Sequence, residues 1–123
     1  MMHIAKVTPE IEPMITPTGE IIHELIGLYS EPKNPRHGVA QITLPPGKGA
    51  AKHYHPKAEE SYYMMSGTAQ MILGEEQSVL SSGDAILIPT GVPHKIWNET
   101  EQDVVFLAIC LPSWDSDCSV YLE

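Results

Sequence analysis

Basic residues are scarce in this chain of 123 residues, and the scarcity argues against several kinds of partner. Arg36 is the single arginine, and the 7 lysines and arginines are spread out against 16 acidic residues, for a formal net charge of −9. Nucleic acids and anionic membranes bind basic patches, so we expect neither as a partner. The surplus of acid is interpreted as a solubilising surface.

Long apolar segments and a cysteine framework are also missing. Residues 1–13 lack the apolar core of a secretory signal, and the longest apolar run, 104–111, is too short to span a bilayer. We therefore expect a soluble, cytoplasmic protein. Two cysteines do not make a disulfide framework. Cys110 is predicted to be a small core residue, and Cys118 could be an exposed thiol.

The length and composition suit one compact domain. Hydrophobic residues make up 42% and charged residues 19%, close to the globular average, which argues against disorder or a coiled coil. Pro9, Pro13 and Pro17 stand four residues apart, a spacing that blocks a regular helix. We expect residues 1–18 to form an extended N-terminal arm and residues 19–123 to form a single domain.

Short segments with strand character follow one another, separated by turn residues. Residues 20–29 fit a strand or one face of a helix about equally well. Residues 37–44 alternate as a strand and end at a Pro-Pro-Gly break. Further strands are predicted at 51–55, 60–66, 69–73, 77–80, 85–88, 94–98 and 104–111. Such a series predicts an all-β sandwich or a closed barrel.

Three histidines and a glutamate are placed where they could share one metal ion. His53 and His55 stand two apart on a predicted strand, so their side chains point to the same face. Glu60 opens the next strand, and His94 opens a later one. Inside a barrel the four side chains could meet. Imidazole nitrogens and one carboxylate suit iron, manganese, nickel, copper or zinc and leave coordination positions open.

Each of these residues could instead have a role that involves no metal. His53 and His55 could be exposed on a hydrated strand, and Glu59 and Glu60 could be surface acids. The third histidine, close behind a Pro-Xaa-Gly turn, favours metal binding. The histidines interpreted as surface or core residues are His3, His23 and His37.

The spacing of these residues resembles the two sequence motifs of the cupin superfamily. The first motif is glycine, five residues, His-x-His, three or four residues, Glu, six residues, Gly; its matches are Gly47, His53, His55, Glu60 and Gly67. The second is glycine, five residues, Pro-x-Gly, two residues, His, three residues, Asn; its matches are Gly83, Pro89, Gly91, His94 and Asn98. The short gap between the motifs, residues 68–82, is typical of small single-domain members.

The resemblance implies an all-β, double-stranded β-helix (jelly-roll) barrel of the cupin type over residues 19–123, with one divalent metal bound inside. The ligands it implies are His53, His55, Glu60 and His94. The six-residue spacing to Gly67 selects Glu60 over Glu59, and the fold makes residues 20–29 a strand. Gly67 and Gly83 are placed where tight turns need a positive φ.

Side-chain parity predicts the lining of the pocket. Tyr62 and Met64 share the inward face with Glu60, and Ile96 shares that of His94. Weaker candidates for the lining are Gln41, Met71, Trp97 and Phe106. For each apolar candidate, a place in the plain barrel core fits equally well.

Several activities are compatible with such a site. Three neutral imidazoles and one carboxylate leave a divalent ion with about one positive charge, which favours a small ligand that chelates through paired oxygens. A dioxygenase-like reaction is the first hypothesis, because metal and oxygen carry the difficult steps. A non-catalytic, metal-dependent binding protein is the second. A metal-dependent isomerase or lyase that uses Tyr62 as acid or base is the third. Small cupins commonly form dimers, so we expect a homodimer.

Overall fold

The computed structural model describes residues 2–8, 11–32 and 34–123, and every regular element within these ranges is a β-strand. The strands are β1 (Met14–Ile15), β2 (Ile21–Ile26), β3 (Gly38–Leu44), β4 (His53–Tyr54), β5 (Glu59–Ser66), β6 (Thr68–Leu73), β7 (Glu76–Ser81), β8 (Ala85–Ile88), β9 (His94–Trp97), β10 (Val104–Leu111) and β11 (Val120–Tyr121). The predicted all-β fold is confirmed. Among the described residues, no helix has the length and apolarity that a bilayer crossing requires.

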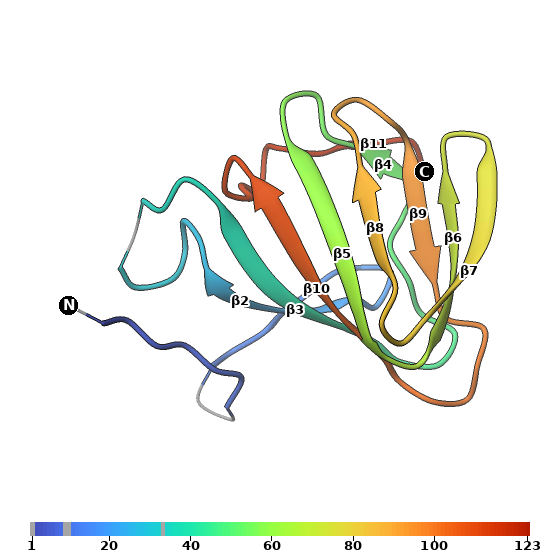
Figure 1. Ribbon diagram of the computed structural model, residues 1–123, viewed down its shortest axis with the longest axis horizontal. Helices are drawn as coiled ribbons and strands as arrows, with labels where there is room; N and C mark the ends of the chain where they lie inside the picture. Colours follow the sequence, from blue (N-terminus) through green and yellow to red (C-terminus); the bar gives the residue numbers. More distant parts are fainter. Residues whose placement is uncertain (1, 9–10, 33) are drawn as a thin grey trace.

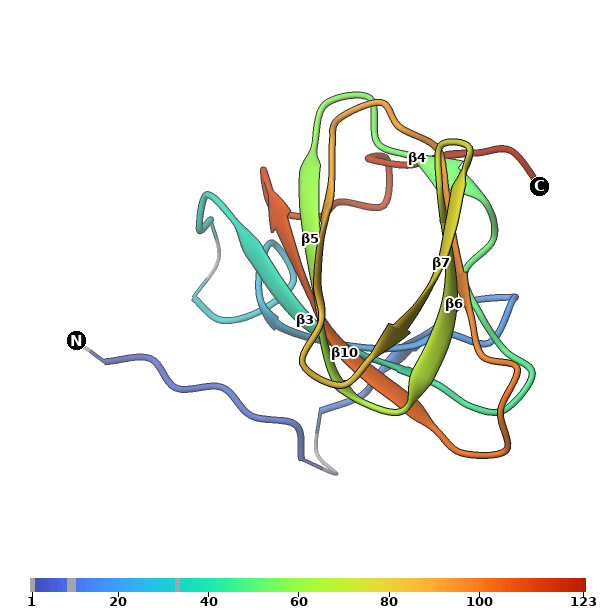
Figure 2. The same ribbon diagram turned by 45° about the vertical axis from the view of Figure 1, so that its right-hand side comes forward.

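Two antiparallel sheets face each other (Figure 1). The first has the strand order β1-β2-β3-β10-β5-β8, and the second has the order β11-β4-β9-β6-β7. Figure 2 looks into the space between them, with β5 on one side and β6 and β7 on the other. Because β4 and β9 belong to one sheet and β5 to the other, side chains from these strands can meet in the interior.

The core follows from the period-two alternation of the strands. On β5, Tyr62 and Met64 are buried, whereas Tyr63 between them is exposed. The largest fully buried side chains are Phe106, Leu44, Met64, Met71, Ile88, Ile96, His94, Val104 and Asn98. Burial of each large apolar side chain contributes roughly 1.5–3 kcal/mol, so the core holds β5, β9 and β10 firmly in place.

Tight turns and one buried amide connect the sheets. Gly67 has a φ of 83°, and a Cβ atom there would lie 2.6 Å from the carbonyl oxygen of Asp103, so no other residue fits without a shift. Gly83, with a φ of 93°, has open space around it. The positive φ values predicted for both glycines are confirmed. Asn98 donates from Nδ2 to the carbonyl oxygens of Leu44 (2.9 Å) and Gln102 (2.6 Å).

The N-terminal part folds back onto the first sheet. The helical alternative for residues 20–29 is wrong, because Ile21–Ile26 forms β2 and pairs along β3. Residues 14 and 15, near the end of the predicted arm, form β1 and pair with β2. Pro9, the first of the three spaced prolines, lies outside the described residues. The predicted strand 51–55 is shorter in the structure, where β4 contains only His53 and Tyr54.

Candidate metal centre

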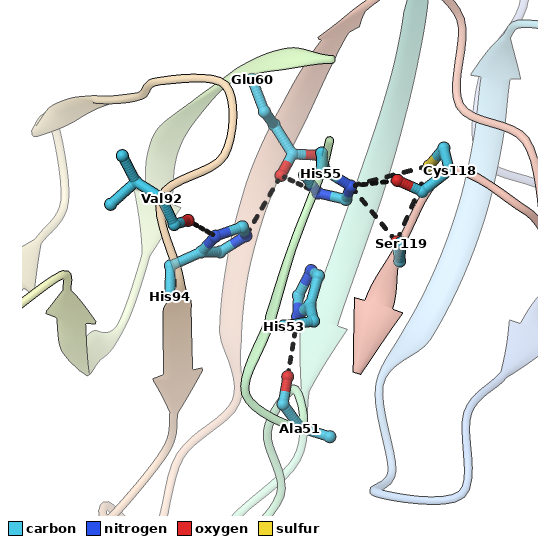
Figure 3. Close-up of polar contacts among 8 residues, drawn as sticks. All are labelled: Ala51, His53, His55, Glu60, Val92, His94, Cys118 and Ser119. Atoms are coloured by element: carbon cyan, nitrogen blue, oxygen red, sulfur yellow. Dashed lines mark hydrogen bonds and ion pairs between the residues drawn. The ribbon is translucent and has the colours of Figure 1, made fainter. Parts of the chain in front are cut away.

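Three imidazoles converge in the interior of the domain. His53 and His94 are directly paired across β4 and β9, with ring centroids 4.3 Å apart, and His55 follows β4. All three side chains are buried, and each offers one ring nitrogen within 4.8 Å of the others. Figure 3 shows the rings of His55 and His94 turned toward Glu60, which reaches in from β5.

Each ring is held from behind through its Nδ1 atom (Figure 3). The carbonyl acceptors are those of Ala51 for His53 (2.7 Å), Cys118 for His55 (3.2 Å) and Val92 for His94 (3.1 Å). Because a carbonyl oxygen only accepts, each Nδ1 carries a hydrogen, and Nε2 is the atom left for a ligand. Two of the acceptors stand two residues before their histidine, so the strand entry itself sets the ring orientation.

Glu60 forms a buried charged pair with His55. Its Oε1 atom lies 3.2 Å from Nε2 of His55 and 3.6 Å from Nε2 of His94. Burial alone would raise the pKa of Glu60, but the contacts with the two histidines lower the pKa to about 2. Burial alone would lower the pKa of His55, but its hydrogen bonds with Cys118 and Glu60 raise the pKa to about 10.

The donor set fits a divalent metal ion. Burial, followed by the nearby His94, lowers the pKa of His53 to about 4, so this imidazole is neutral and able to ligate at neutral pH. The Nε2 atom of His94 is buried without a hydrogen-bond partner among the described residues. An orphaned buried nitrogen is costly unless something binds it. A cluster of three histidines that could hold a metal ion is therefore present, and Glu60 adjoins two of them.

A cavity of about 410 Å³ meets the cluster at Glu60. It lies against the inner face of the first sheet, where one row of paired residues runs Glu24, Ala40, Ala108 and Tyr62 across β2, β3, β10 and β5. The neighbouring row runs Ile22, Ile42, Phe106 and Met64 and fills the core. The small side chains of Ala40 and Ala108 in the first row leave room for the cavity, and Ile22 and Ile42 of the second row also line it. Tyr121, whose ring lies 5.5 Å from that of His53, also lines the cavity.

The residues predicted to line the pocket fall in different places. Tyr62 lines the cavity and is almost fully buried, with its ring 6.3 Å from that of His94. Four others lie in the hydrophobic core: Met64, Met71, Ile96 and Phe106. Gln41 is half-buried and alternates with the cavity-lining Ala40 and Ile42, so it faces away. The half-buried Trp97 donates its indole hydrogen to Glu99.

Three acidic residues of the cavity were missed by the sequence reasoning, and they are Glu12, Glu20 and Glu24. Glu20 and Glu24 line the cavity together with Ile22. Glu20, Ile22 and Glu24 stand at alternate positions, which could have placed the two glutamates on one face, but only once this segment is known to be a strand. Burial, followed by the charge of Glu60, raises the pKa of Glu20 to about 7. Burial also raises the pKa of Glu24.

Comparison with known proteins agrees with this architecture. The family model for the cupin domain matches residues 40–110. An uncharacterized protein of Methanocaldococcus jannaschii is 33% identical over 116 residues, covering 93% of this chain and 90% of the relative.

Two solved structures have the same fold. KdgF from a Halomonas species superposes with a TM-score of 0.78 at 18% identity, covering 94% of this chain and 97% of the other. A Lactobacillus farciminis oxalate decarboxylase in complex with formate superposes with a TM-score of 0.78 at 21% identity, covering 92% of this chain and 34% of the other. At such identities the likeness shows the double-stranded β-helix fold alone. With a family match over more than half of its length and a relative aligned along nearly all of it, the chain belongs to the cupin superfamily.

Proposed function

We propose that the protein binds one divalent transition metal and acts on a small molecule that chelates this metal through paired oxygens. The proposed ligands are His53, His55, Glu60 and His94. The observation that carries the proposal is the buried Nε2 atom of His94, which has no hydrogen-bond partner among the described residues and lies 3.6 Å from Oε1 of Glu60. When bound, the metal would supply Lewis-acid or oxygen-activating chemistry.

The residues around the cluster would orient the metal and the ligand. The carbonyl groups behind each Nδ1 hold the rings in the ligating tautomer. The proton that His55 shares with Glu60 would compete with a metal for Nε2, so metal uptake would release a proton. The apolar walls around Tyr62 would exclude water from the reacting groups.

Tyr62 is suited to donating a hydrogen bond and unsuited to acting as a base. Burial, followed by the charges of Glu60 and Glu20, raises the pKa of Tyr62 well above 10, so the phenol keeps its proton. This disfavours an isomerase or lyase that begins with proton removal by Tyr62. A dioxygenase-like reaction asks for no such base, and it is the activity we propose first.

Oxygen uptake would separate the enzyme from a binding protein. The iron-loaded protein is offered catechols, diketones and thiol acids in an oxygen electrode, with His94→Ala as the inactive control. Oxygen consumption by the wild type alone supports the dioxygenase. Tight ligand binding without oxygen consumption would favour the non-catalytic binding protein. A cytoplasmic homodimer stays a prediction.

Metal content tests the site itself. Elemental analysis of purified protein should find about one metal per chain in the wild type and in His37→Ala, whose exposed histidine lies outside the cluster. His55→Ala and His94→Ala should lose most of the metal, because each removes one ligand. Unchanged metal content in both cluster variants would refute the ligand set.

A further inference from the structure

The acidic and basic side chains among the described residues that line the cavity are all carboxyl groups. Four of the described lining residues are glutamates, and none of them is a lysine, arginine or histidine. The four are Glu12, Glu20, Glu24 and Glu60. Among the described residues, Glu60 is paired with His55 and His94, whereas no ion pair is found for Glu12, Glu20 or Glu24.

The placement of two glutamates follows from the strand pairing. Glu24 stands opposite Ala40 on β3, in the row that continues through Ala108 to Tyr62. Its Oε2 atom accepts one hydrogen bond, from the backbone N–H of Tyr29 at 2.9 Å. That bond orients the carboxylate without neutralising it.

Glu20 is placed close to the metal cluster. It enters the cavity from the turn before β2, where its backbone N–H donates to Oγ1 of Thr16 at 3.0 Å. Its side chain lines the same cavity as Glu60, Tyr62 and Tyr121. A negative charge at Glu20 therefore faces the same small volume as the carboxylate proposed as a metal ligand.

We infer that the ligand of this cavity is an uncharged or cationic small molecule with paired oxygens, and that the glutamates on β2 and before it repel anionic relatives of that ligand. The inference rests on the proposed function and narrows it. A divalent ion with Glu60 would leave about one positive charge, which the remaining carboxylates offset. A phosphate or a dicarboxylate would therefore meet a neutral or negative field, without the basic clamp that such anions need.

Three probes with the same chelating diol but different charge test this inference. They are catechol, which is neutral, 3,4-dihydroxybenzoate, which is anionic, and dopamine, which is cationic. Zinc is the metal for the titration calorimetry, because it has no redox chemistry that would destroy the probes. Relative to their affinities for free zinc, 3,4-dihydroxybenzoate should bind the protein at least about tenfold more weakly than catechol, and dopamine as tightly or more tightly.

Matched variants locate the cause of the discrimination. Glu20→Gln and Glu24→Gln remove charge with little change of shape. Each should reduce the difference in affinity between 3,4-dihydroxybenzoate and catechol severalfold. Glu75→Gln removes one charge from an exposed turn outside the cavity and should leave this difference unchanged. Far-ultraviolet circular dichroism of each variant confirms that it is folded.

The outcomes separate this inference from the proposed function. If the wild type takes up no zinc, the metal-binding proposal fails, and the same titrations of the metal-free protein, followed by NMR shifts, still rank the three probes by charge. Equal binding of all three, tightest binding of 3,4-dihydroxybenzoate, or no binding of any probe in either form would overturn the inference. A charge order that is lost in Glu20→Gln and kept in Glu75→Gln supports it.

Discussion

Replacement of Glu20 by glutamine should stabilise the metal-free protein above neutral pH. Burial and the neighbouring Glu60 raise the pKa of Glu20 from 4.5 to about 7 in the folded protein. The native state therefore binds more protons than the unfolded chain between these two values. The stability associated with this group is complete below about pH 4.5 and is lost as the pH rises through about 7. Glutamine carries no charge, so the variant avoids this loss.

The magnitude follows from the size of the shift. A pKa of about 7 in the folded protein, in place of 4.5, corresponds to about 3 kcal/mol of unfolding free energy at high pH. Water reaches part of the Glu20 side chain, which is half-buried, so we expect a gain of about 1–2 kcal/mol. The gain should be small near pH 4.5 and should level off above about pH 8.

Urea unfolding between pH 4.5 and 8.5 measures this difference. A chelator is included, because a bound cation would itself lower the pKa of Glu20. Glu75→Gln is the control, since its carboxylate is exposed. A Glu20→Gln variant with the same pH dependence as the wild type would show that Glu20 ionises freely. Neither burial nor the charge of Glu60 would then act on this carboxyl group in the folded protein.

Three further predictions concern the framework around the site. Asn98→Ala should lower the unfolding free energy by about 2–4 kcal/mol in urea, because it leaves two carbonyl groups and one backbone N–H without their partner; a loss below 1 kcal/mol would contradict this. Gly67→Ala should cost about 1–3 kcal/mol more than Gly83→Ala, because only the first would bring Cβ to 2.6 Å from Asp103, and equal losses would argue against the contact. Ala108→Leu should fill the cavity and weaken catechol binding about tenfold or more with metal content unchanged, so unaltered calorimetric affinity would place the ligand elsewhere.

Much of the fold could be predicted from the sequence because its signals are local. Turn glycines and the alternation of apolar residues marked the strands, and β8 and β10 have the predicted bounds. The two motifs named four residues that the structure brings together, although His53 and His94 are far apart in the chain. The spacing within the two motifs therefore predicted a long-range contact that local hydrophobic patterns do not encode.

The cavity could not be predicted, because it depends on register between distant strands. Ala40 and Ala108 are unremarkable small residues until pairing places them side by side in one row. The carbonyl oxygen of Cys118 and Nδ1 of His55 are in contact although they are 63 residues apart, and no local sequence pattern predicts this contact. Glu24 on β2 and Glu20 just before it were not predicted as lining residues for a different reason, because this segment suits a helix as well as a strand.

The most direct test of the metal centre is anomalous X-ray scattering from crystals grown with a divalent transition metal. We predict a single strong peak bounded by Nε2 of His53, His55 and His94 and by the Glu60 carboxylate, at the edge of the cavity. No peak at this position, or a metal bound only at surface groups, would contradict the metal centre and the function built on it.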